Sequence, residues 1–204
     1  MQSNELVCTH HLLSTMYIMS TYSTRQWWVR NGLGLTVSDR MDAIEPEERV
    51  AALRLEAVMP GPAVLAPRDA FPGSQAYVFA HALGLVSSDA PVTASEATLA
   101  LAAWPLMRMG FAGQVHPQWG RLLGVDIPAG TNPLGGPVFD VQGRLTGMSL
   151  ATLGAPNRLV PASILLRQGW AGSPAASTAP LARLAPDALY EQGLSSTLQI
   201  ICAS

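Results

Sequence analysis

The stretch that decides the fold runs Thr131-Asn-Pro-Leu-Gly-Gly-Pro-Val-Phe-Asp140-Val-Gln-Gly-Arg-Leu-Thr-Gly-Met148. The adjacent Gly135 and Gly136 allow backbone conformations and close approaches that a Cβ would forbid. After them, Val138-Phe139 predicts the start of a strand, residues 140–143 predict a turn, and Leu145 begins the return strand. The sequence therefore predicts a tight glycine-rich loop followed by a β-hairpin.

This loop resembles the nucleophile loop of trypsin-like serine peptidases, most closely that of the HtrA/Deg branch. The branch carries the pattern T-D-x-x-x-N-P-G-N-S-G-G-P, and Asp126 together with Gly135-Gly136-Pro137 fits it without a gap. The resemblance implies an all-β fold of two six-stranded antiparallel β-barrels with a peptide-binding cleft between them. In this register Leu134 stands at the nucleophile position, and a leucine side chain has no nucleophilic atom.

The resemblance also assigns positions to the other two members of the catalytic triad. The general-base histidine of the family follows a strand, and His11, within the run Glu5–Leu13, is its best counterpart. Val50–Leu55 matches the strand that follows the triad aspartate. Arg49 stands where that aspartate would be. A guanidinium cannot accept the histidine N–H, and its charge disfavours an imidazolium. His11, Arg49 and Leu134 thus keep the family's order, with two of the three catalytic groups replaced.

The oxyanion hole of this family uses the backbone N–H groups of the nucleophile and of the residue two positions before it. Leu134 and Asn132 hold those positions here, and both keep an N–H. Pro133 lies between them, where it restricts φ and removes a donor, and Asn132 replaces a glycine of the family. We therefore expect a degenerate, inactive site in which Leu134 intrudes into the substrate cleft.

The resemblance, together with the turn and strand patterns, implies two barrels and a displaced terminal segment. Asn31-Gly32 predicts a hairpin, Pro72-Gly73 a turn before a strand at Gln75–Ala80, and Pro161 the start of a short closing helix. We expect four parts in order: a first barrel truncated at its N-terminus (1–72), a second barrel with the nucleophile loop (73–168), a small-residue linker (169–180), and a helix followed by a strand (181–204).

The terminal segment resembles the start of a trypsin-like domain, although here it stands at the C-terminus. Pro186-Asp187 predicts the beginning of a helix, and Leu198–Cys202 is typical of a strand. Either the domain is circularly permuted, so that this strand completes the first barrel, or the chain is one unit of tandem copies cut in a shifted frame. Permutation predicts that Leu198–Cys202 pairs beside Leu6–Thr9, with Cys202 near Cys8, and it would remove an open barrel edge.

Composition excludes several other classes of function. The chain is 49% hydrophobic and 13% charged with a net charge of −2, and all 12 of its cationic Lys/Arg positions are arginine, without a basic stripe, so nucleic acid is not expected as a partner. No apolar stretch reaches the ~20 residues of a membrane span. The first residues lack the basic and apolar regions of a signal peptide, and two cysteines set no disulfide framework. The compartment stays unassigned, although members of the resembled family are often periplasmic, and no cofactor is expected.

The leading functional hypothesis is an inactive trypsin-like domain, a pseudo-peptidase that binds or scaffolds a peptide or protein in the inter-barrel cleft. A second is residual serine-type endopeptidase activity with Thr131 or another hydroxyl as nucleophile. A third is a transition-metal site formed by Cys8, His10 and His11, which offer thiolate and imidazole ligands at strand spacing. A product that has lost any function is the fourth.

Overall fold

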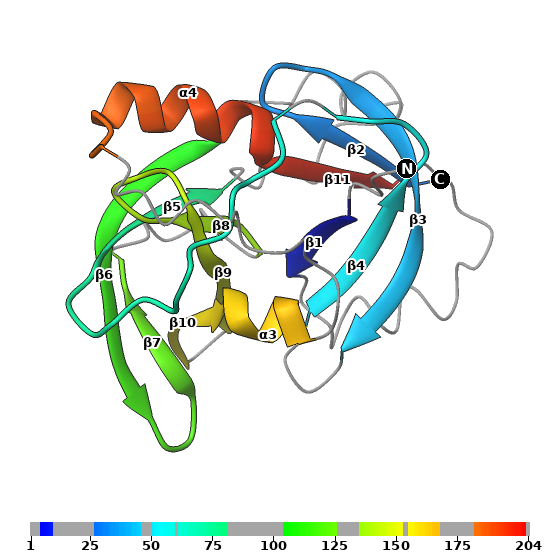
Figure 1. Cartoon of the computed structure of the whole chain (residues 1–204). Coiled ribbons are helices and arrows are strands. Elements are labelled where there is room, and N and C mark those ends of the chain that lie inside the picture. The colour runs from blue at the N-terminus through cyan, green and yellow to red at the C-terminus, as the bar shows by residue number, and fades with distance from the viewer. Residues whose placement is uncertain are drawn as a thin grey trace, which may run out of the picture.

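The computed structural model describes residues 5–9, 27–45, 50–59, 61–80, 104–125, 135–152, 155–167 and 182–202. These ranges hold two sheets and two short helices, so the fold is all-β apart from the two helices (Figure 1). The elements are, in order, β1 (Glu5–Thr9), β2 (Trp27–Asn31), β3 (Thr36–Glu45), β4 (Val50–Leu55), β5 (Gln75–Ala80), β6 (Leu106–His116), β7 (Gly120–Gly124), β8 (Pro137–Phe139), β9 (Leu145–Thr152), β10 (Ala155–Pro161), α3 (Ala162–Arg167), α4 (Pro186–Ser196) and β11 (Leu198–Cys202).

Strands β5 to β10 close into a six-stranded antiparallel barrel in the order β10-β7-β6-β5-β8-β9. Every second side chain of a strand points into the barrel and fills its interior, because successive side chains point to opposite faces. Ala76 and Val78 of β5 face inward, where they meet Leu123, Val138 and Leu159. The predicted strand at Gln75–Ala80 and the hairpin after the glycine loop are therefore confirmed, and so is one of the two expected barrels.

The remaining strands form an antiparallel sheet in the order β1-β4-β3-β2-β11, called the N-terminal sheet here. Its core consists of Val29, Val37, Leu53 and Met59. The hairpin predicted at Asn31 is confirmed, because the Asn31 side-chain oxygen accepts from the N–H of Leu33 and of Leu35 at 3.1 and 2.9 Å. In the part of the chain that is described, this sheet has five strands whose outer members β1 and β11 are not joined, so it is not a closed barrel.

The predicted C-terminal strand exists, but its predicted partner is wrong. Leu198–Cys202 pairs antiparallel with β2, with Leu198 opposite Asn31 and Cys202 opposite Trp27, and not with β1. Cys8 lies opposite Ala51 in β4, at the other end of the strand order. The reason is that α4 delivers the chain to the β2–β3 turn, where the Gly32 N–H donates to the Leu194 carbonyl at 2.7 Å.

Helix α4 connects the barrel to the N-terminal sheet. In Figure 1 it lies across the barrel strands and runs directly into β11. Pro186 occupies its first turn, as the sequence predicts, and the helix ends where the Thr197 N–H donates to the Gly193 carbonyl at 2.8 Å. A third apolar cluster lies between α4 and the barrel, and it is formed by Tyr77 and Phe79 on the outer face of β5, Phe139, and Leu189 of the helix.

The sheet and the barrel also meet directly. Ala52 of β4 packs with Met148, Leu150, Val160 and Leu165, which come from β9, β10 and α3. The passage between β4 and β5 runs along β9, since Leu65 forms a parallel bridge with Leu145. Backbone bonds hold this passage: Ala66 N–H donates to the Leu145 carbonyl at 2.9 Å, and Leu145 N–H donates to the Val64 carbonyl at 2.7 Å. Helix α3 follows Pro161 as expected.

Candidate functional site

The second half of the glycine loop is the described part of the candidate site, and strand β9 holds it in place. Gly135 has φ +78°, a left-handed conformation that favours glycine. Its N–H donates to the Ser149 carbonyl at 3.1 Å, and the Ser149 N–H returns a bond to the Gly136 carbonyl at 2.8 Å. The buried Ser149 hydroxyl donates to the same carbonyl at 3.1 Å. The loop therefore enters β8 along a fixed path.

Gly136 is glycine because the backbone of β5 passes against it. A Cβ added there would collide with the Phe79 carbonyl oxygen and lie 2.8 Å from its carbon. A strand and a loop can come this close only where no side chain stands between them. The Gly135-Gly136 pair thus serves two separate needs, a left-handed turn and a close backbone approach.

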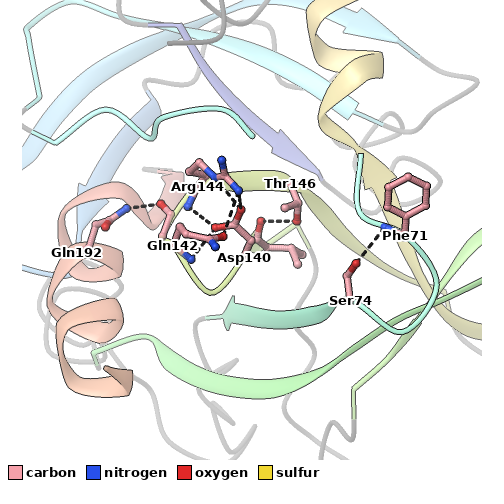
Figure 2. Close-up of polar contacts among 9 residues, drawn as sticks. Phe71, Ser74, Asp140, Gln142, Arg144, Thr146 and Gln192 are labelled. Carbon is pink, nitrogen blue, oxygen red and sulfur yellow. Dashed lines mark hydrogen bonds and ion pairs between the residues drawn. The ribbon is translucent and has the colours of Figure 1, made fainter. Parts of the chain in front are cut away.

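The turn between β8 and β9 is organised by Asp140 (Figure 2). One carboxylate oxygen accepts from the backbone N–H groups of Gln142 and Arg144, both at 2.9 Å. The other accepts from the Arg144 guanidinium at 2.8 and 2.7 Å. The Arg144 guanidinium also donates to the Gln142 side-chain oxygen at 3.1 Å. The predicted turn at 140–143 is confirmed, and Asp140 serves to shape it.

Helix α4 fixes the same turn from outside. The Gln192 side-chain amide donates to the Gly143 carbonyl, as Figure 2 shows, and the Leu184 N–H donates to the Val141 carbonyl at 2.9 Å. Gly143 has φ +73°, and a Cβ there would run into the Gln192 side chain and the Leu184 methyl group. The loop, the hairpin and the terminal helix therefore form one connected structure.

The sequence-predicted catalytic and oxyanion positions lie outside the described residues. These are His11, Arg49, Asn132 and Leu134, and Thr131 and Pro133 fall outside as well. The structure does place the strand ends beside them. Thr9, the last residue of β1, is paired with Val50, the first residue of β4, and β1 contacts β9. The described strand ends that lie nearest in sequence to His11 and Arg49 are therefore side by side in the sheet.

Hydroxyl groups on the described residues are not placed with an imidazole. Ser163 at the start of α3 donates from its hydroxyl to Asp69 at 2.7 Å, and its N–H bonds the same carboxylate at 3.2 Å. This Asp69 contact is a helix cap. Of the four histidines, the described ranges contain His116, which stacks on Trp119 at 4.5 Å and accepts from a backbone N–H. No serine triad is therefore assembled within these ranges.

The metal hypothesis is untested for the same reason as the triad. Within the described ranges no group of three His, Cys, Asp or Glu side chains is arranged to hold a metal ion. Cys8 lies in β1, whereas His10 and His11 lie beyond its described end. The site of Cys8, His10 and His11 therefore stays a prediction. None of the helices in the described part is long and apolar enough to cross a membrane.

Sequence reasoning missed the residue that joins the glycine loop to α4, Phe79. It is fully buried, its ring meets Phe139 edge-on at 5.5 Å, and it stacks on Tyr190 at 6.1 Å. Its backbone carbonyl lies against Gly136, and its ring lies against Gly193 of α4. The signal available in the sequence was Gly193 itself, a glycine inside an otherwise helical pattern, which usually has a packing reason.

Comparison with known proteins identifies the fold. No family model matches the chain, and no curated protein matches it. Among the solved structures to which the chain is similar are two that match over 81% of it. One is Deg5, at 16% identity and a TM-score of 0.56 over 77% of its own chain. The other is the apo MamO protease domain from Magnetospirillum magneticum, at 17% identity and a TM-score of 0.51 over 83% of its chain. The closed barrel, the glycine loop between β7 and β8, and these neighbours together show that the chain has a trypsin-like, HtrA-like fold.

Proposed function

We propose that this chain is a catalytically inactive trypsin-like domain that binds an extended peptide or protein segment in the cleft between its two halves. The observation that carries the proposal is Leu134 at the nucleophile position. The residues directly after it, Gly135-Gly136-Pro137, lead into β8 on a backbone path fixed by Ser149, so the register of the loop motif has structural support. An aliphatic side chain there has no atom that can attack a carbonyl.

The acid position supports the same proposal. Arg49 directly precedes β4, whose first residue is paired with Thr9, two residues before His11. In an active triad the group beside the histidine accepts its N–H and stabilises the imidazolium. A guanidinium does neither, because it has donors alone and carries the same charge as the imidazolium. Losing both groups removes the chemistry while the framework around it is retained.

We also propose the finer architecture on which this cleft depends. The N-terminal sheet is the described part of the first of two barrels, and the chain is circularly permuted, with β11 entering this barrel beside β2 rather than beside β1. Supporting this, β11 extends the N-terminal sheet through β2, and the segment that carries it resembles the start of such a domain. An extended ligand would pair along a strand edge, with affinity from main-chain bonds and specificity from alternate side chains.

Catalysis is tested with a quenched fluorogenic peptide library and matched variants. The unmodified protein and His11→Ala are expected to give the same rate as each other, because loss of the nucleophile alone costs about as much turnover as loss of the whole triad. Leu134→Ser alone and together with Arg49→Asp tests which group is missing. Turnover by the unmodified protein that disappears in His11→Ala would overturn the proposal, and with it the inactive assignment of Leu134.

Binding is tested separately by fluorescence anisotropy with labelled casein peptides. Saturable binding is expected, and N-methylation of alternate peptide amides is expected to weaken it, since each methyl group removes one strand-pairing donor. Leu134→Ala should alter the affinity, because its side chain would stand in the cleft. Absence of saturable binding at micromolar protein, in a preparation with native circular dichroism, would count against a binding role.

A further inference from the structure

The terminal segment, defined here as residues 182–202, binds almost entirely to parts of the chain that are distant in sequence. Tyr190 donates to the Pro105 carbonyl at 2.9 Å, 85 positions away, and Gln192 reaches the Gly143 carbonyl, 49 positions away. Strand β11 pairs with β2 along its whole length. Nothing in these contacts depends on which chain supplies the segment. Residues 168–181 provide the covalent connection to α3.

The contact surface of the terminal segment is specific enough to recognise a second copy. Leu189 is buried against Phe79 and Phe139, and the backbone of Gly193 packs closely against the Phe79 ring. The last turn of α4 contacts the N-terminal sheet, where the Gly32 N–H donates to the Leu194 carbonyl at 2.7 Å. The segment therefore contacts the barrel and the N-terminal sheet at the same time. A second copy of this chain carries an identical segment and can make the same contacts.

The junction between α4 and β11 is the weakest part of this contact. Thr197 is 1% exposed and Asn31 3% exposed, yet the Thr197 hydroxyl and the Asn31 amide nitrogen find no hydrogen-bond partner in the described part of the chain. Asn31 lies opposite Leu198, so both groups belong to the same junction. A buried polar group left without a partner destabilises the contact in which it is buried. Opening is therefore cheapest where the segment meets β2.

The connection of residues 168–181 favours such an opening. It is composed mainly of Gly, Ala, Ser, Thr and Pro, which suits a linker rather than a packed element. In general, a short linker of small residues holds the module that it connects at an effective concentration of the order of mM. Docking within one chain therefore dominates in dilute solution, and docking between chains competes when the chains are concentrated during folding.

We propose that the terminal segment exchanges between copies, so that α4 and β11 of one chain fill the same positions on a second chain and form a domain-swapped dimer. Both arrangements contain the same contacts, including the β2–β11 ladder and the Gly193–Phe79 packing. The difference is the covalent linkage, so the ratio of monomer to dimer is set by chain concentration during folding. The swapped dimer stays trapped after dilution, because release requires α4 and β11 to leave together.

The paired strands provide a direct test, because Arg30 lies opposite Gln199 in the β2–β11 ladder. Full-length Arg30→Cys and Gln199→Cys chains are made in a background with Cys8→Ser and Cys202→Ser, mixed in denaturant, and refolded together over a range of concentrations. Exchange is expected to give a disulfide-linked heterodimer that increases with concentration. In the control, the Arg30→Cys chain is mixed with a Gln114→Cys chain, whose cysteine is exposed on β6, and this pair should give only background crosslinking.

A second measurement uses the unmodified sequence and does not depend on the cysteine variants folding. Unlabelled and ¹⁵N-labelled chains are refolded at high concentration, and dimers and their rate of chain exchange are followed by native mass spectrometry. Thr197→Val removes the unsatisfied hydroxyl at nearly constant volume, so exchange should become about tenfold slower, which corresponds to about 1.4 kcal/mol. A protein that stays monomeric at every refolding concentration, dimers without the 30–199 crosslink, or an unchanged exchange rate in Thr197→Val would each overturn the proposal.

Discussion

Gly193→Ala is the substitution that most directly tests how α4 is attached to the barrel. In an unobstructed helix interior this change stabilises by about 1 kcal/mol, because alanine loses less backbone entropy than glycine. Here the new Cβ would collide with the Phe79 ring, where even the third-nearest atom, Cδ1, would be 2.7 Å away. Carbon atoms pack best at about 3.5–4.0 Å. The helix and the ring would therefore have to separate by about 1 Å or more.

Phe79 cannot supply that space by moving. It is fully buried, the Phe139 ring blocks one side, Tyr190 stacks on another, and its backbone carbonyl lies against Gly136. Overpacking a core of this kind costs about 1–3 kcal/mol and occasionally more. Because three ring atoms would lie within 2.7 Å of the new Cβ, we take the upper end of this range, about 3 kcal/mol. After subtracting the propensity gain of about 1 kcal/mol, we expect Gly193→Ala to lower the free energy of unfolding by about 2 kcal/mol.

The assay is urea denaturation followed by tryptophan fluorescence and circular dichroism. Glu191→Ala, on the exposed side of the same helix, is the matched control and should change stability by less than about 0.5 kcal/mol. In a Phe79→Leu background, Gly193→Ala should become neutral or stabilising, giving a coupling free energy of about 2 kcal/mol. Stabilisation by Gly193→Ala in the otherwise unmodified protein would show that the helix does not rest on the ring, and the reasoning would fail.

Three further substitutions probe single contacts by thermal and urea unfolding. Asp140→Asn keeps an acceptor for the turn but removes the ion pair with Arg144, so we expect the free energy of unfolding to fall by about 1 kcal/mol. Because salt screens the ion pair, added salt should lower the stability of the unmodified protein more than that of the variant, and an equal salt dependence in both would contradict the assignment. Asp69→Ala removes the cap at Ser163 and should cost about 1 kcal/mol, and a neutral result would mean that the cap does not hold α3. Tyr190→Phe keeps the aromatic stack and loses one hydrogen bond, so the expected cost is about 1 kcal/mol, whereas a cost above about 3 kcal/mol would show that the ring itself has been displaced.

Much of the local structure could be predicted because its causes lie within a few residues. The turn at 140–143 depends on a carboxylate that bonds backbone groups two and four positions later, and the start of α4 depends on the fixed φ of Pro186. The strand at 50–55 has the bounds that the match to the family's motif implied, and the strand at 75–80 follows the Pro72-Gly73 turn as predicted. The glycine loop carried enough of the family's pattern to predict a trypsin-like barrel, which the solved structures support.

The catalytic positions could be assigned only from the resemblance to the family, because a sequence does not give the distances between residues. His11, Arg49 and Leu134 are far apart along the chain, and their roles depend on three loops meeting in space. What the structure adds is the pairing of Thr9 with Val50, which sets the ends of β1 and β4 side by side, and the fixed path from Gly135 into β8.

By itself the sequence determined the turns at 31–32 and 140–143, the strands at 75–80 and 198–202, the starts of α3 and α4, and the absence of a nucleophilic group at residue 134. Each of these follows from the chemistry of one residue and its near neighbours. Tertiary structure alone decided that β11 joins β2 rather than β1, and that Gly193 belongs inside α4. Both outcomes depend on Phe79 and the β2–β3 turn, which lie far away along the chain and meet the terminal segment only after folding. Hydrophobic pattern identifies which face of an element is buried, but the choice of partner is made by the shapes that close packing brings together.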